Sequence, residues 1–207
     1  MHLSDGVMPT SLALGSGVVS LALTAWSSRM TRSEDLPKVA VVAAAFFVAA
    51  LVHVPLGPTS VHLLLPGLVG ALLGPSAFLA IALGLVLQSL MFQFGGLTAL
   101  GGNALLMGLP AFACGLVFQL FKGVGAKRQM LVGALCGGLG IVGAALLLAV
   151  LLYMSGEDFL GVAELALAAH LPVAGIETLI AAFIIRFLHK VKPEMLSAPF
   201  TLKRKTS

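Results

Sequence analysis

The sequence predicts an all-α polytopic membrane protein with seven transmembrane helices. The chain of 207 residues is 59% hydrophobic and only 10% charged, and its mean hydropathy is +1.08. Soluble domains contain about 25% charged residues, so a chain this apolar is expected to have a bilayer as its solvent. Seven apolar stretches are candidates for spanning helices; they cover residues 9–27, 39–54, 61–74, 76–93, 103–121, 130–153 and 161–188.

A spanning helix takes about 20 residues, so seven helices and their connections use residues 1–207 as one transmembrane domain. No length remains for a separate soluble domain, and we expect any ATPase to be carried by another chain. The stretch 61–74 is short and contains Pro66 and Gly67, residues that break or tilt a membrane helix.

The basic residues predict the orientation of the chain. With seven spans and the N-terminus outside, every Lys and Arg lies on the cytoplasmic side, as the positive-inside rule requires, whereas six spans would place one basic group outside. The net charge of +4 is therefore expected to face the cytoplasm and lipid headgroups, and nucleic acid is not an expected partner. The twelve basic residues are Arg29, Arg32, Lys38, Lys122, Lys127, Arg128, Arg186, Lys190, Lys192, Lys203, Arg204 and Lys205.

The first two residues form a candidate metal chelate on the outer side. The α-amine of Met1, the amide nitrogen of His2 and the His2 imidazole can close five- and six-membered rings on one ion. A fourth nitrogen from His62, or from its rival His53, would complete an all-nitrogen, tetragonal set. Such a set suits Ni(II) or Cu(II) and accepts Co(II), whereas Mg, Ca and structural zinc prefer other ligands. Position 2 alone is a weak signal, since a histidine near a start codon is commonly an accident.

A glycine-rich segment on the same side precedes the fifth apolar stretch. It runs from Gly95 and Gly96 through Thr98 to Asn103, and its glycines allow a tight or re-entrant loop. Asn103 is expected to cap the following helix, to orient a ligand histidine, or both.

Two sets of polar residues inside apolar stretches have open roles. His170 and Glu177 are seven positions apart and share one helix face; they either reach the metal site or pair with another helix. Ser16, Ser20 and Thr24 form a row of small residues that either packs within the chain or docks a partner membrane subunit. Gln88 either makes interhelical hydrogen bonds, which is the favoured role, or lines the cavity.

Four segments together resemble the CbiM/NikM family, the substrate-specific membrane components of energy-coupling factor transporters for cobalt and nickel. They lie in the family's order along nearly the whole chain. The segments are Met-His-Leu-Ser-Asp-Gly-Val-Met-Pro at residues 1–9, Pro-Leu-Gly-Pro-Thr-Ser-Val-His at 55–62, the glycine-rich run at 88–103 and Ala-His-Leu-Pro-Val-Ala-Gly-Ile-Glu at 169–177.

The resemblance implies a seven-helix fold whose N-terminus inserts from outside into the bundle. It implies Ni(II) or Co(II) as transported substrate, without an organic cofactor, bound by the Met1 amine, the amide and imidazole of His2 and the imidazole of His62. The segment from Gly95 to Asn103 would close over this site. The implied partners are a membrane coupling subunit (the T component), two cytoplasmic ABC ATPases and a small accessory membrane protein, all at the cell membrane.

Three other functions compete with metal capture. An intramembrane metalloprotease would need a motif such as HExxH, which the sequence lacks, so no enzyme activity is expected. A stand-alone secondary transporter would show inverted repeats or acidic residues at the midplane, and neither is evident. A vitamin-binding component of similar architecture would not need His2. The choice between nickel and cobalt stays open because the same ligands accept both.

Overall fold

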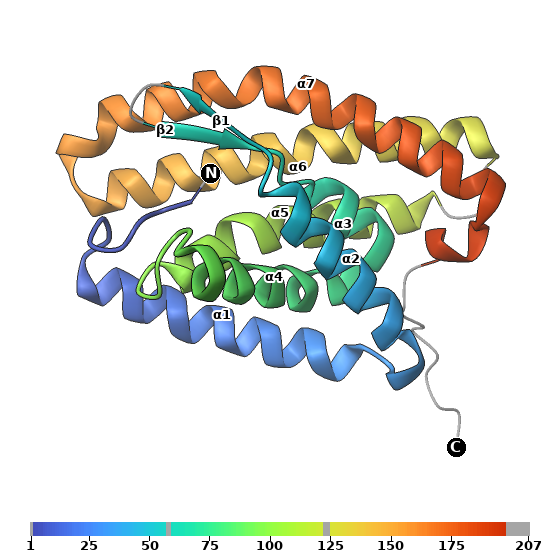
Figure 1. The fold of residues 1–207 in the computed structure, drawn as a ribbon, viewed down its shortest axis with the longest axis horizontal. Coiled ribbons are helices and arrows are strands. Elements are labelled where there is room, and N and C mark those ends of the chain that lie inside the picture. The colour runs from blue at the N-terminus through green and yellow to red at the C-terminus, as the bar shows by residue number, and fades with distance from the viewer. Residues whose placement is uncertain (1, 57–58, 122–124, 198–207) are drawn as a thin grey trace.

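The computed structural model describes residues 2–56, 59–121 and 125–197, and their fold is almost entirely helical (Figure 1). The helices are joined by short 3₁₀ turns and by one antiparallel β-hairpin. The elements are α1 (Thr10–Met30), α2 (Leu36–Ala49), β1 (His53–Leu56), β2 (Thr59–His62), α3 (Pro66–Leu73), α4 (Ala77–Phe92), α5 (Leu100–Leu120), α6 (Ala126–Ser155) and α7 (Leu160–Val191), with 3₁₀ turns at Ser33–Asp35, Gly74–Ser76 (η2), Glu157–Phe159 and Pro193–Leu196 (η4).

The helical membrane class is confirmed, whereas the number of spans stays a prediction. Within the described residues, five segments are long and apolar enough to cross a bilayer: α1, the continuous unit Pro66–Phe92, α5, α6 and α7. The α2 helix has 14 residues, short of the 20 or so that a perpendicular span needs. The α3 and α4 helices share one segment because only η2 separates them.

The predicted helical stretches 39–54 and 61–74 are wrong where they approach each other. The hairpin takes the end of the first and the start of the second, with His53 paired to His62 and Val54 to Val61. Proline lacks the backbone N–H that a helix interior needs, so Pro55 falls in a strand and Pro66 falls at the first position of α3.

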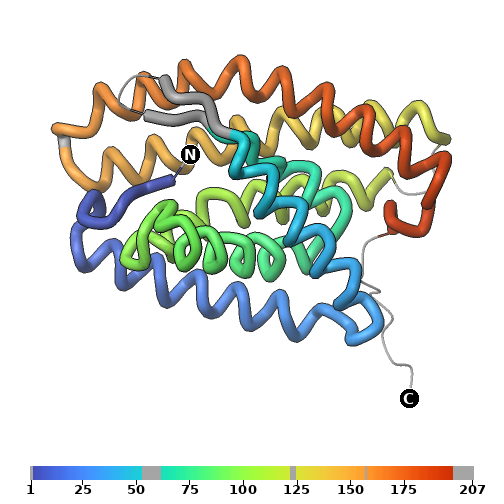
Figure 2. Tube along the Cα trace, in the orientation of Figure 1, coloured from blue at the N-terminus to red at the C-terminus, as the bar shows by residue number. Residues whose placement is uncertain are grey.

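The long helices lie in layers, with α1 on one side of the molecule and α7 on the other (Figure 2). The α6 and α7 helices pack along each other, and α5 lies between α6 and α1. The α3 helix is central, and all eight of its residues are buried. A Cβ atom on Gly67 would lie 1.8 Å from the Cys136 carbonyl oxygen, and one on Gly70 would lie 1.9 Å from that of Ala111. The backbone of α3 therefore touches the backbones of α5 and α6 directly.

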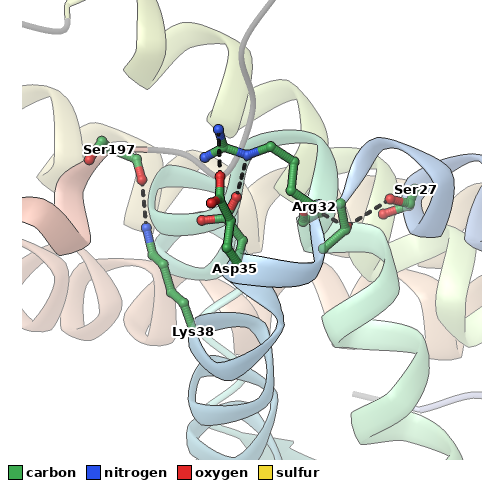
Figure 3. A network of polar contacts seen from close by, with 8 residues as sticks. Ser27, Arg32, Asp35, Lys38 and Ser197 are labelled. Carbon is green, nitrogen blue, oxygen red and sulfur yellow. Dashed lines mark hydrogen bonds and ion pairs between the residues drawn. The ribbon is translucent and has the colours of Figure 1, made fainter.

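One end of the bundle is tied together by polar contacts (Figure 3). Arg32 donates from Nε to Asp35 at 2.8 Å, and Lys38 donates from Nζ to the Ser197 carbonyl at 2.7 Å. Ser27 at the end of α1 donates to the Pro75 carbonyl in η2 at 2.6 Å. This end also holds the start of α6 and the end of α7 (Figure 1). The basic residues of the described part therefore gather at the end opposite the N-terminus.

Candidate metal centre

The structure brings His2 and His62 together, although 60 positions separate them in sequence. Their imidazole ring centroids are 5.3 Å apart with perpendicular planes. His2 reaches this place because the segment before α1 folds back over the bundle, and His62 because it ends β2. His62 is buried, with 5% of its surface exposed. The two imidazoles thus meet edge to face, with the His62 side buried and His2 half-buried.

Each ring nitrogen of His2 has a distinct environment. Nε2 lies 3.0 Å from Oε1 of Gln88, a fully buried residue of α4. An amide oxygen only accepts, so Nε2 carries the proton and Nδ1 carries the lone pair. Nδ1 is buried and has no hydrogen-bond partner among the described residues. It is also the atom that closes a six-membered ring with the amide nitrogen of its own residue.

His62 is held in the complementary way. Its Nδ1 lies 3.1 Å from the carbonyl oxygen of Ala50, directly after α2. Because a carbonyl only accepts, Nδ1 donates and the lone pair lies on Nε2. Metal-binding histidines commonly donate one ring N–H to a backbone carbonyl, which fixes the orientation of the other nitrogen. The two imidazoles therefore present one lone pair each.

The environment also keeps His2 neutral. Burial lowers the pKa of His2 well below its ordinary value, and neighbouring His62 lowers it further. A metal ion binds only the unprotonated imidazole. Phe94 lies against both rings, with centroids 6.3 Å from His2 and 5.8 Å from His62. The site is thus apolar on this side, and the His2 imidazole can accept a cation without first losing a proton.

Asn103 supports the N-terminal segment rather than a histidine ring. Its Oδ1 accepts from the Leu3 amide at 2.8 Å, and its Nδ2 donates to the Leu3 carbonyl at 3.0 Å. The expected cap role is wrong, because α5 begins at Leu100 and Asn103 lies within its first turn. Asn103 therefore fixes the backbone directly after His2.

The glycine-rich segment clamps the same N-terminal residues. Thr98 donates to Oδ1 of Asp5 from its amide at 2.8 Å and from its hydroxyl at 2.5 Å, and these bonds lower the pKa of Asp5. Gly95 and Gly96 both have positive φ angles, of 79° and 71°, which favour glycine. A Cβ on Gly96 would lie 2.1 Å from the carboxylate carbon of Asp5. The segment thus contacts the N-terminal residues directly, and its closure over a metal site stays a prediction.

His170 and Glu177 have separate partners. His170 donates from Nδ1 to the Ala166 carbonyl one turn earlier in α7, at 2.6 Å. Glu177 accepts backbone hydrogen bonds from Leu64 and Leu65, directly after His62. Of the predicted pair, only Glu177 is connected to the segment that carries a candidate ligand.

The small-residue row of α1 packs within the chain. Ser16 and Ser20 are buried, at 5% and 6% exposure, and Ser20 donates to the Gly101 carbonyl of α5 at 2.7 Å. Thr24 is half-buried and donates to the Ser20 carbonyl. Ser16 and Ser20 therefore pack against α5, and docking of a partner subunit by this row stays a prediction.

The sequence did not assign Phe94 to the site, and it offered Gln88 only as the less favoured alternative of a cavity-lining residue. Both belong to the segment that the resemblance singled out, but nothing in an apolar helix shows which neighbour a glutamine faces. Met1 and the side chain of His53 lie outside the described residues. Their roles as amine ligand and rival ligand stay predictions.

The long apolar helices define a multi-pass membrane protein. Comparison with known proteins places it in the transition-metal transporter class. A family described as "Cobalt uptake substrate-specific transmembrane region" (CbiM) matches residues 2–195. The chain belongs to this family, which confirms the resemblance seen in its sequence.

Individual relatives and a solved structure agree. A putative metal transport protein of Haemophilus influenzae is 39% identical over 95% of this chain and 97% of its own length. The cobalt transport protein CbiM of Sorangium cellulosum is 31% identical over 95% and 94%, and the fused nickel transport protein NikMN of Rhodobacter capsulatus is 32% identical over 95% and 64%. The crystal structure of a transition metal transporter superposes with a TM-score of 0.77 at 26% identity, over 92% of this chain and 93% of that one.

Proposed function

We propose that this chain is the metal-capture subunit of an ATP-driven energy-coupling factor transporter for Ni(II) or Co(II). The observation that carries the proposal is the buried lone pair of His2 Nδ1, which has no partner among the described residues and lies in a ring that faces His62. A buried nitrogen without a partner is costly unless a ligand satisfies it. Membership of the cobalt uptake family supports a transition metal ion as that ligand.

The proposed ligands are the Met1 amine, the His2 amide nitrogen and Nδ1, and Nε2 of His62. Gln88 holds the His2 ring so that Nδ1 is unprotonated, and Ala50 does the same for Nε2 of His62. The amide of His2 must lose its proton to bind, so uptake releases protons. An all-nitrogen set of this kind suits Ni(II) and accepts Co(II).

In this proposal, the partner subunits drive release of the metal ion to the cytoplasm. A chelate that includes a deprotonated amide holds its ion tightly, and we propose that the T component and two ATPases supply the work that opens it. A small accessory membrane protein is a further expected partner. We propose that the N-terminus lies outside and that the basic end of the bundle lies in the cytoplasm, as the positive-inside rule predicts.

Metal binding to the purified chain tests the proposal. Loaded with Ni(II), the protein should hold one ion and show the yellow absorption of square-planar nickel. Both should be lost in His2→Ala and in a variant with one residue inserted between Met1 and His2. His189→Ala is the matched control, because His189 bonds Gln129 at 3.0 Å in another part of the chain. Binding that survives the insertion would rule out the chelate.

A further inference from the structure

Glu177 is a fully buried carboxylate on α7 that bonds the chain beside the metal site. Its side chain has 0% exposure. Oε1 accepts from the Leu64 amide at 2.7 Å and from the Leu65 amide at 2.8 Å. Hydrogen bonds from backbone amides to a carboxylate are among the stronger ones in proteins. One oxygen atom of α7 therefore holds two consecutive peptide groups more than 110 positions away.

The peptide that Glu177 holds has an unusual conformation. Leu65 has a φ of 54°, in the left-handed region that non-glycine residues seldom adopt. Such a conformation persists only where the surroundings enforce it. Pro66 follows and begins α3. The turn thus joins β2 to α3 through a strained residue whose own amide is one of the two that Glu177 binds.

This turn begins directly after His62. The His62 ring donates to the Ala50 carbonyl. Two and three positions further along the chain, the amides of Leu64 and Leu65 donate to Glu177. Beyond the turn, α3 contacts the backbones of α5 and α6 through Gly67 and Gly70. The position of His62 therefore depends on an anchor at each end of a short segment.

We propose that Glu177 is a positioning residue for metal capture: it fixes the turn after His62 and so keeps the His62 imidazole opposite His2. This inference rests on the proposed function. Glu177 acts through hydrogen bonds to the main chain and is not a ligand. The feature that it must supply is an acceptor oxygen at one place, which an amide side chain of the same length also supplies.

Three substitutions separate this role from a general need for a buried carboxylate. Glu177→Gln keeps the acceptor oxygen, and Glu177→Leu removes it at similar volume. Glu177→Asp shortens the side chain by one methylene group and so moves the acceptor oxygen away from the two amides. It provides a second test if the Glu177→Leu protein does not fold. Thr178→Val is the matched control, because Thr178 lies next to Glu177 and its hydroxyl donates to the Ala174 carbonyl within α7.

Two measurements are made on the full chain in detergent. The first is the Ni(II) dissociation constant, determined by competition with a chelator. The second is amide hydrogen exchange over residues 62–65 in the metal-free protein. Glu177→Leu and Glu177→Asp should weaken Ni(II) binding by about 10–100-fold, the usual effect of losing a group that orients a ligand. Both should speed exchange in the segment, whereas Glu177→Gln and Thr178→Val should stay near the wild type in both measurements.

The outcomes separate this inference from the proposed function. A folded Glu177→Leu protein with wild-type affinity and exchange would overturn the positioning role. Glu177→Gln as weak as Glu177→Leu would also overturn it, because charge would then matter and not the acceptor position. If the wild type binds no Ni(II), the proposed function fails, and the exchange measurement alone still decides whether Glu177 fixes the turn.

Discussion

At the scale of single residues, Gln88 determines which nitrogen of His2 is available. Its oxygen lies 3.0 Å from Nε2, so Gln88→Leu should free the ring to place its proton on Nδ1. We expect Ni(II) affinity to fall by about 10–100-fold, while Gln88→Glu, which keeps an acceptor, should still bind. Chelator competition measures the affinity, and ¹⁵N shifts of the imidazole in the metal-free protein report the tautomer.

Gln119→Leu is the matched control for this prediction, since Gln119 also lies in a helix, near the end of α5. If Gln88→Leu binds Ni(II) as the wild type does and keeps the same tautomer, then Gln88 only packs the helices together. The sequence favoured that interhelical role.

His2 also makes the stability of the metal-free protein depend on pH. Burial lowers its pKa well below the ordinary value of 6.5. Below about pH 6.5, the His2 imidazole is therefore protonated in the unfolded chain before it is protonated in the folded chain. Stability contributed by the neutral ring is therefore present above about pH 6.5 and is lost as the pH falls below that value. The melting temperature should drop over this range more steeply in the wild type than in His2→Asn. Parallel pH profiles for the two proteins would contradict the prediction.

At the scale of elements, the clamp between Asp5 and the glycine-rich segment should control how long the metal stays bound. Thr98→Val removes the hydroxyl that donates to Asp5 but keeps the amide. We expect Ni(II) to dissociate several-fold faster, because the hydroxyl bond to the Asp5 carboxylate helps to hold the segment against the N-terminal residues. Stopped-flow release to a chelator measures the rate.

Thr98→Ser is the control for the clamp because it keeps the hydroxyl. Equal release rates for wild type, Ser and Val variants would show that the segment closes without this bond. Because Asp5 is exposed to solvent, any departure of the Thr98→Val release rate from this expectation should be toward a smaller increase.

The elements also show what the sequence could and could not predict. Apolar runs of spanning length predict α1, α5, α6 and α7, and the chelate chemistry of residues 1–2 with the motif at 55–62 indicates His2 and His62. The strands β1 and β2 lie where apolar composition predicts the end of one helix and the start of the next. Hydropathy alone does not distinguish an apolar strand from a helix end. The contacts of Gln88 and Glu177 depend on which helices are neighbours, which a single sequence does not specify.

At the scale of the whole molecule, the orientation in the bilayer is open to a direct test. In a background without Cys114 and Cys136, Asp158→Cys lies at the N-terminal end of the bundle and Lys192→Cys at the basic end; both positions are exposed. A membrane-impermeant maleimide added to intact cells should label Asp158→Cys and leave Lys192→Cys unlabelled until the cells are opened. The reverse labelling pattern would contradict the N-outside orientation.

The buried α3 helix has a consequence for permeability. It begins four residues after His62 and ends at η2, which bonds the end of α1 at the basic side. Along this line, the described chain offers packed main chain with no space for a methyl group at Gly67 or Gly70. At these two positions, the contact between the backbones of α3, α5 and α6 leaves no room for an ion to pass. Under the proposed function, an ion held between His2 and His62 stays on one side of this contact, and α3 must separate from α5 and α6 before the ion can pass there.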